Sequence, residues 1–362
     1  MKRFIVSGAV LACAVFAAQA NIASAQPEEI AVDPDDTYVH EWTGASLPAE
    51  IFGMKRDVIV QYQERASNIG ANYDNGRNTY LSVYIYRHGA GDASLWHDRA
   101  RHMMVTRDQY AHFDPDKWDT TVFDPFGGTN PSAIMTIGEG NGGGFRSTGV
   151  VIFTAEDWMF KVRMSSASHS ADELRMAMQN AILELAVSAP DRAEEAAYTM
   201  TDCGETLVFE PAEITRDRAR VSELSVAAGI ALITAADIER AVPIDRSIVY
   251  CREGRNRDTT TIYRPNESRE AYLIAVQDAG VAIEVARIAS LFPLDDGSDD
   301  SKPEYAAITS TSLEYRMDGP FQSLPDPQQA YDFGNSNPPF ATVSRPLGDE
   351  GANVTITTDD SE

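Results

Sequence analysis

Cysteine, basic side chains and long apolar runs are all scarce in this chain of 362 residues, and each scarcity excludes something. Lys and Arg number 30 against 55 Asp and Glu, which gives a formal net charge of −25. A surface so acidic repels phosphate backbones and anionic headgroups, so nucleic-acid binding is excluded. Beyond the N-terminus no apolar run reaches the roughly 20 residues that a membrane-spanning helix needs, so we expect no membrane insertion of the mature chain.

The N-terminus has the three regions of a secretory signal peptide. Lys2-Arg3 precede an apolar run over Phe4–Ala20, and the small residues Ala23-Ser24-Ala25 follow. We predict that residues 1–25 are removed by cleavage near Ala25 and that the mature protein is periplasmic or secreted. An uncleaved membrane anchor is the alternative, but the run is rich in Ala and slightly short for a span.

Only three cysteines occur, and Cys13 lies in the predicted signal peptide. Cys203 and Cys251 remain as an even pair, which in an oxidising compartment is most simply one disulfide bond. The alternative is a redox or nucleophilic thiol. Because no C-x-x-C motif occurs and neither cysteine has a His nearby in sequence, we predict a structural disulfide.

The composition divides the mature chain into about two domains and a tail. We predict an extended lead-in over 26–45 and two α+β units over 46–190 and 199–292, each a helix packed on an antiparallel sheet. Residues 293–362 hold 8 of the 18 prolines and 14 acidic residues against 3 basic ones. That composition is typical of disorder, so we predict a largely disordered acidic tail with one ordered patch near Tyr305–Tyr315.

The stretch Gly144–Val187 predicts the framework of the first unit. Gly149–Thr154 is a β-branched and aromatic strand, and Trp158–Met164 alternates strictly between apolar and largely charged residues. That alternation predicts a strand with one buried face and one solvated face. Ser170 and Glu173 fit a capping box at the start of a helix whose apolar stripe we expect to cover the buried face.

Other local patterns predict further elements. Asp92–Val105 suits a capped helix, and Phe113–Thr129 is loop-like because of its Asp-Pro breakers. In the second unit, Thr206–Phe209 is an expected strand and Ser222–Ile233 an expected buried helix. A short helix is expected over Thr234–Val242.

A hairpin is also predicted around Asn75-Gly76, and its second arm alternates between aliphatic residues and tyrosines. Tyr80, Tyr84 and Tyr86 share one face of that arm. One interpretation makes this face a stacking platform for a glycan or another ligand with an apolar face. The other makes it the second face of a sheet, covered by a helix or a flanking loop. These three tyrosines are the candidate ligand or partner face.

Catalytic and metal-binding patterns fail their own structural requirements. Gly138–Gly143 contains a G-x-G-x-x-G string, but a strand follows where a dinucleotide site needs a helix N-terminus. His97 and His102 lack the spacing of H-E-x-x-H, and Asp295–Asp300 lacks the EF-hand pattern. We therefore assign no catalytic residues, no metal ligands and no cofactor.

The order of elements from Leu47-Pro48, through the hairpin and the middle helix, to the strand–strand–helix of Gly149–Leu185 resembles uncharacterised exported bacterial proteins. It is similar to the PsbP/Mog1-like α+β sandwich. The resemblance covers about 45–190 and implies an adaptor or assembly role more than catalysis, and it carries over no functional residues.

The leading hypothesis is a non-enzymatic envelope protein. It binds a partner protein of the envelope or a small ligand through the sheet of the first unit or the cleft between the units. The alternative is a hydrolase or metalloenzyme whose site is assembled from distant residues. A purely structural or surface-coat role is a third hypothesis.

Overall fold

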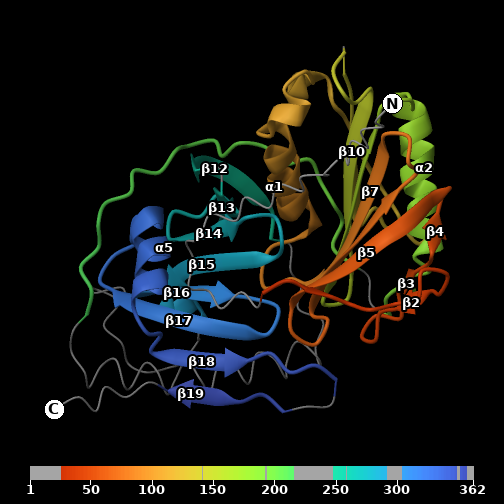
Figure 1. Ribbon diagram of the computed structural model, residues 1–362. Coiled ribbons are helices and arrows are strands. Elements are labelled where there is room, and N and C mark those ends of the chain that lie inside the picture. Colours follow the sequence, from red (N-terminus) through yellow and green to blue (C-terminus); the bar gives the residue numbers. More distant parts are fainter. Residues whose placement is uncertain are drawn as a thin grey trace, which may run out of the picture.

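The computed structural model describes residues 26–140, 142–191, 194–215, 248–257, 259–291, 304–348 and 351–356. Two large antiparallel sheets make up most of this part of the chain, and helix α1 (Ala93–Val105) stands between them (Figure 1). The expected α+β fold is wrong, because antiparallel strands dominate and the described residues form only four α-helices. The signal peptide, the helices expected over Ser222–Ile233 and Thr234–Val242, and the Asp295–Asp300 run lie outside the described residues.

The first sheet has nine strands in the order β1-β5-β6-β7-β11-β10-β9-β8, with β4 paired to the end of β5. A separate two-stranded sheet joins β2 to β3 in the lead-in. The strands of this unit are β1 (Glu28–Glu29), β2 (Tyr38–Val39), β3 (Ser46–Leu47), β4 (Glu50–Ile51), β5 (Met54–Gln63), β6 (Asn68–Asp74), β7 (Thr79–Arg87), β8 (Asp119–Phe123), β9 (Ala133–Glu139), β10 (Ser147–Ala155) and β11 (Trp158–Ser166). The strand β8 lies within Phe113–Thr129, so the loop expected there is wrong in part.

Helix α2 (Ala171–Glu184) covers one face of this sheet, as the alternation of β11 predicts. The Ser170 backbone N–H donates to the Glu173 carboxylate at 2.8 Å, and the Glu173 N–H donates back to the Ser170 hydroxyl at 3.3 Å. This confirms the capping box, which satisfies two N–H groups that a helix start leaves open. Phe160 and Val162 of β11 pack in the same buried core as Leu174 of the helix.

The second sheet is a meander in which eight consecutive strands each pair with the next. Its strands are β12 (Tyr250–Arg257), β13 (Thr260–Pro265), β14 (Ala271–Val276), β15 (Val281–Arg287), β16 (Tyr305–Ser310), β17 (Glu314–Phe321), β18 (Ala341–Ser344) and β19 (Val354–Ile356). Four of these strands, together with helix α5 (Pro327–Ser336), fall in the segment expected to be a disordered tail. β16 lies in the patch near Tyr305–Tyr315 that was expected to be ordered, but the expected disorder is wrong for the other described residues of this segment. Its prolines are compatible with ordered elements: Pro327, for example, occupies the first turn of α5, directly after the cap residue Asp326.

The two faces of the second sheet are both covered. Along β14, Tyr272, Ile274 and Val276 pack in a core shared with Ala330 of α5. Leu273, which points to the opposite face, packs in a second core that is shared with α1. A short helix, α4 (Ile288–Leu291), follows β15. The strand expected over Thr206–Phe209 is not formed: this segment runs beside the sheet without regular structure.

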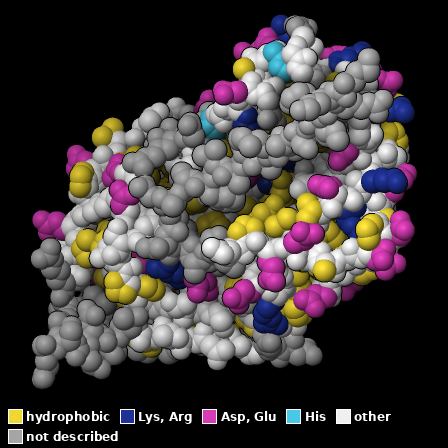
Figure 2. Space-filling view, in the orientation of Figure 1, with side chains coloured by type: hydrophobic (Ala, Val, Ile, Leu, Met, Phe, Trp, Pro, Cys, Tyr) yellow, Lys and Arg dark blue, Asp and Glu magenta, His cyan; other side chains and the backbone are white. Residues whose placement is uncertain are grey.

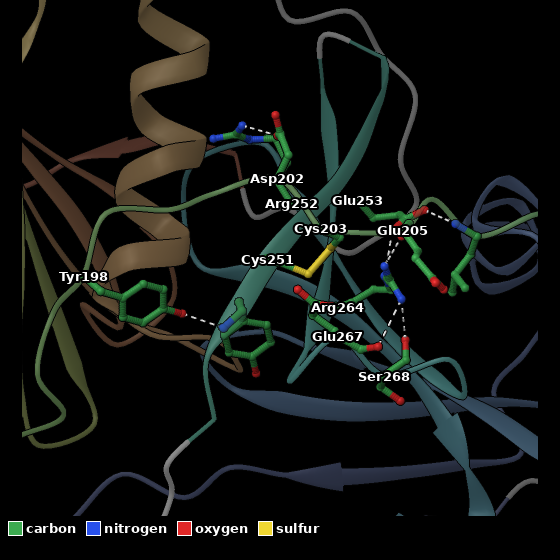
Figure 3. The surroundings of a disulfide bond; sticks show 12 residues. Tyr198, Asp202, Cys203, Glu205, Cys251, Arg252, Glu253, Arg264, Glu267 and Ser268 are labelled. Atoms are coloured by element: carbon green, nitrogen blue, oxygen red, sulfur yellow. Dashed lines mark hydrogen bonds and ion pairs between the residues drawn. A yellow bond between two sulfur atoms is a disulfide. The ribbon is translucent and has the colours of Figure 1, made fainter.

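The predicted disulfide is confirmed and ties the segment that enters the second unit to its first strand. The bond joins Cys203 to Cys251 of β12 with a Cα–Cα distance of 4.9 Å. Beside it, the buried Arg264 of β13 forms an ion pair with Glu253 at 2.6 Å and donates to the backbone oxygen of Glu267 at 3.1 Å (Figure 3). The disulfide therefore lies in a network of charged groups that holds the same edge of the sheet.

Candidate functional site

The face of the first sheet opposite α2 is the candidate site, and most of it is buried. Sequence alternation predicts that Met159, Lys161, Arg163 and Ser165 of β11 face water. That expectation is wrong for three of them: Met159 is 0% exposed, Lys161 2% and Ser165 6%. Helix α1 covers this face over β9 and β10, and the second sheet packs against the other side of the same helix.

A carboxylate on α1 joins that helix to the second sheet. Asp98 accepts hydrogen bonds from Nε of Arg252 at 2.9 Å and from the hydroxyl of Tyr263 at 2.9 Å, and a second guanidinium nitrogen of Arg252 completes a bidentate pair. Asp98 is buried, whereas Asp202, the other partner of Arg252, is exposed. Burial, and then the charge of Asp98, raise the pKa of Tyr263 well above its ordinary value, so its hydroxyl stays a donor.

A second ion pair crosses between the units over β7 and β11. Nζ of Lys161 lies 3.1 Å from the Asp278 carboxylate, in the turn between β14 and β15, and also donates to the Asp278 backbone oxygen. The same nitrogen lies 4.5 Å from the ring centroid of Tyr84. Burial acts to raise the pKa of Asp278, but Lys161, Arg163 and Arg107 outweigh it and hold that pKa at about 2. Three cations therefore surround one carboxylate.

The same turn seals Tyr86 into the interface. Tyr86 is 1% exposed, and its hydroxyl donates to the sulfur of Met159 at 3.1 Å. Gly280 has a φ of +81°, and a Cβ atom placed there would lie 2.8 Å from the Tyr86 ring. Tyr86 is therefore part of the core between the units and offers no surface to a ligand.

Replacing Gly280 with alanine is expected to lower the free energy of unfolding by about 1–2 kcal/mol more than replacing Gly76. Both glycines have positive φ, which strains an L side chain, but nothing lies within 4 Å of a Cβ at Gly76. The difference between the two losses of unfolding free energy measures the contact of the turn with Tyr86, because a methyl group added at Gly280 overpacks the interface there. Urea unfolding of the two variants measures it, and equal costs would contradict the contact.

The rest of this face stays accessible, and two tyrosines lie flat on it. A Cβ at Gly70 of β6 would lie 2.9 Å from the Tyr84 ring and 3.0 Å from the Tyr62 ring. Glycine is needed because both rings fold over its Cα, with centroids 6.4 Å apart and planes tilted by 30°. Both side chains are partly exposed. We call these two rings the tyrosine platform.

A second aromatic group stands farther along β7, and we call it the aromatic wall. It consists of Tyr80, Phe145 and Tyr110, in which the Tyr80 ring meets Phe145 edge-on at 6.0 Å and Tyr110 stacks on Phe145 at 5.9 Å. The Tyr110 hydroxyl shares a hydrogen bond of 3.0 Å with Ser165 of β11. Tyr80 is 49% exposed, so the wall borders solvent.

A polar row separates the platform from the wall. Arg163 of β11 lies opposite Ser82 of β7, which lies opposite Asn72 of β6, and the Ser82 hydroxyl donates to the Asn72 side chain at 2.8 Å. Arg163 is partly buried, and its guanidinium makes no hydrogen bond or ion pair with any described residue. We call the platform, the wall and this row together the open face.

The positive charges of Arg163 and Arg107 act on residues of the open face and its border. Burial acts to raise the pKa of Tyr110, yet the positive charges of Arg163 and Arg107, with a hydrogen bond from Ser165, bring that pKa below its ordinary value. Burial lowers the pKa of Lys161, and the same two arginines lower it further. A local excess of positive charge on a chain of net charge −25 favours an anion at this point.

In the space-filling view, hydrophobic side chains, among which tyrosine is counted, gather in a recess near the middle of the molecule (Figure 2). Basic and acidic side chains lie along its border. The recess lies beside the first sheet, where Figure 1 shows the two units facing each other.

The structure separates the three tyrosines that the sequence grouped. Tyr84 belongs to the platform and Tyr80 to the wall, but Tyr86 is buried under the second unit. Sequence reasoning missed Tyr62, because a bulge between Gln61 and Gln63 changes which face its side chain takes. The sequence does offer an indication of Arg163, because Lys161 and Arg163 lie two positions apart on one strand of a chain that is poor in basic residues.

The glycine string over Gly138–Gly143 has a packing role. A Cβ at Gly138 would lie 2.5 Å from the Trp118 indole, and one at Gly143 would lie 2.7 Å from the His112 imidazole. His112 in turn shares a hydrogen bond of 2.8 Å with the backbone oxygen of Phe145. The glycines therefore let the Trp118 and His112 rings lie against the β9–β10 hairpin. Through its hydrogen bond, His112 also helps to position Phe145 of the aromatic wall.

Among the described residues, no group of three or more His, Cys, Asp or Glu side chains is arranged to hold a metal ion. None of the helices in the same part of the chain is both long enough and apolar enough to cross a bilayer. No family model, no curated protein and no solved structure matches the chain.

Proposed function

We propose that this protein is exported to the cell envelope and acts there as a non-enzymatic binding protein whose ligand site is the open face. The predicted signal peptide at residues 1–25 supports export, and a disulfide bond suits an oxidising compartment. The adaptor role implied by the resemblance of residues 45–190 to PsbP/Mog1-like proteins is compatible with this proposal.

One observation carries the proposal. The rest of this sheet face is buried under α1 and the second unit, whereas Tyr62, Tyr80 and Tyr84 stay at least partly exposed around a polar row. Aromatic rings with polar groups between them are typical of a surface that binds a ligand, since the rings supply apolar area and the polar groups fix its orientation.

The test is recovery of envelope components by the mature protein. We expect at least one protein or glycan, identified by mass spectrometry, to be recovered with the wild type and lost with a variant that carries Tyr62→Ala, Tyr80→Ala and Tyr84→Ala. These side chains are partly exposed, so the variant is expected to keep its fold, which circular dichroism checks.

The matched control truncates exposed apolar side chains on the opposite side of the sheet. Met176 and Leu183 of α2 are 57% and 70% exposed, and the variant Met176→Ala with Leu183→Ala is expected to recover the same components as the wild type. The proposal is rejected if the tyrosine variant recovers everything that the wild type does.

A further inference from the structure

Arg163 is the feature of the open face that points to a ligand class. Its guanidinium carries five donors in a planar fork, and no described residue accepts from them. Lys161, two residues earlier on the same face of the strand, forms an ion pair with the carboxylate of Asp278. Arg163 also feels the charge of Asp278, but that carboxylate makes its direct ion pair with Lys161, so one carboxylate faces more than one cation. A bound anion would supply the direct partner that the partly buried guanidinium lacks among the described residues.

The neighbours of Arg163 indicate what else the ligand carries. Ser82 and Asn72 continue its row across the sheet with a hydroxyl and an amide, which donate to and accept from sugar hydroxyls. The tyrosine platform and the aromatic wall flank this row on either side, and Tyr80 and Tyr84 lie four residues apart on one strand, about 13 Å. Polar groups between aromatic rings match a molecule with an apolar face and hydroxyl edges.

We infer that the open face binds an acidic carbohydrate, whose carboxylate pairs with Arg163 while a sugar ring stacks on the tyrosine platform. Arg107, exposed at the end of α1, adds a second positive charge near this point. This inference rests on the proposed function and names its ligand class.

The experiment is calorimetric titration of the mature protein with two matched probes, tetragalacturonate and its methyl ester. The two tetrasaccharides have the same rings, and only the first carries carboxylates. We expect the acid to bind at least tenfold more tightly than the ester, since a charge-assisted bidentate hydrogen bond contributes about 1.5–3 kcal/mol. Raising the salt concentration is expected to narrow the difference.

Arg163→Gln separates this inference from the proposed function. The variant is expected to weaken binding of the acid at least tenfold and to leave binding of the ester nearly unchanged. Arg175→Gln, on helix α2 at the opposite face of the sheet, is the matched control and is expected to bind both probes as the wild type does. Because Arg163 makes no hydrogen bond to a described residue, its replacement is expected to preserve the melting temperature.

Three outcomes overturn the inference. If the acid and the ester bind with equal affinity, the carboxylate has no role in binding. If the tyrosine variant then binds neither tetrasaccharide, the open face is still the binding site and the proposed function stands. If benzoate binds as tightly as tetragalacturonate, the sugar rings do not contribute to the affinity. Absence of binding by either tetrasaccharide rejects an acidic carbohydrate, and the recovery experiment then decides the proposed function on its own.

Discussion

Replacing Asp98 with alanine is expected to lower the free energy of unfolding by about 3–5 kcal/mol, because it removes the buried partner of the largely buried Arg252. The Asp98 side chain is 4% exposed and that of Arg252 is 12% exposed. Truncation removes the bidentate pair with Arg252 and also removes the carboxylate that accepts from the Tyr263 hydroxyl in the core between the units. The measurement is urea unfolding at neutral pH with the disulfide intact, followed by circular dichroism.

Asp202 gives a matched control on the same arginine. It pairs with Arg252 as Asp98 does, but its side chain is 78% exposed, so water replaces the lost interaction. Asp202→Ala is expected to cost less than about 1 kcal/mol. If the two alanine variants cost the same, burial does not govern the strength of this interaction and α1 is not anchored to the second sheet through Asp98.

Local sequence patterns predict much of the first unit. The capping box of Ser170 and Glu173, the Asn75-Gly76 turn and the alternation of Trp158–Met164 each depend on residues within a few positions of one another. Local hydrogen bonds and the pleat of a strand act over the same range, so these elements can be read from sequence. The disulfide is equally accessible, since two cysteines allow only one pairing.

Composition alone gives a wrong prediction for most of the described C-terminal segment. Averaged over 70 residues, acidic and proline-rich sequence is typical of disorder. Order nevertheless extends well beyond the predicted patch near Tyr305–Tyr315, because helix α5 (Pro327–Ser336) and strand β18 (Ala341–Ser344) are formed. The prolines fall at Pro320, near the end of a strand, and at Pro327, in the first turn of a helix, where each is compatible with order. A composition averaged over the whole segment does not reveal short strands, which are stabilised by pairing with neighbouring strands of the meander.

The open face was only partly predictable for a different reason. Alternation shows that Lys161 and Arg163 share a face, but it cannot show that Asp278, 117 residues later, makes its direct ion pair with Lys161. The burial of Tyr86 likewise depends on Gly280 in the other unit. What distinguishes a covered position from an open one on this sheet is the docking of the second unit, and no local pattern encodes that contact.

Replacing Asp278 with alanine is expected to cost about 3–5 kcal/mol, since Lys161 then remains buried without a counter-charge. The Lys161 side chain is 3% exposed and that of Asp278 is 18% exposed, so the two members of the pair are not equivalent. Lys161→Met is expected to cost less than Asp278→Ala, because the orphaned Asp278 keeps some contact with water and lies near Arg163 and Arg107. Replacing both with Met and Leu is expected to restore most of the loss.

The pH dependence of Asp278→Ala tests the cause of its cost. Burial lowers the pKa of Lys161, and Asp278 acts to raise it, so removing Asp278 moves that pKa further below its ordinary value. Between the folded and unfolded pKa values the unfolded chain binds more protons, so the free energy of unfolding rises with pH there. The deficit of Asp278→Ala relative to the wild type should therefore shrink between pH 7 and pH 9.5.

Asp119→Ala provides the control for that comparison, because its pair with Arg175 lies at the surface, where the Asp119 side chain is 68% exposed. We expect it to cost under about 1 kcal/mol and to show no such narrowing. A constant deficit for Asp278→Ala across this pH range would mean that its cost comes from the turn it occupies. The charge of Lys161 would then not be the reason that the second unit is held against the first sheet.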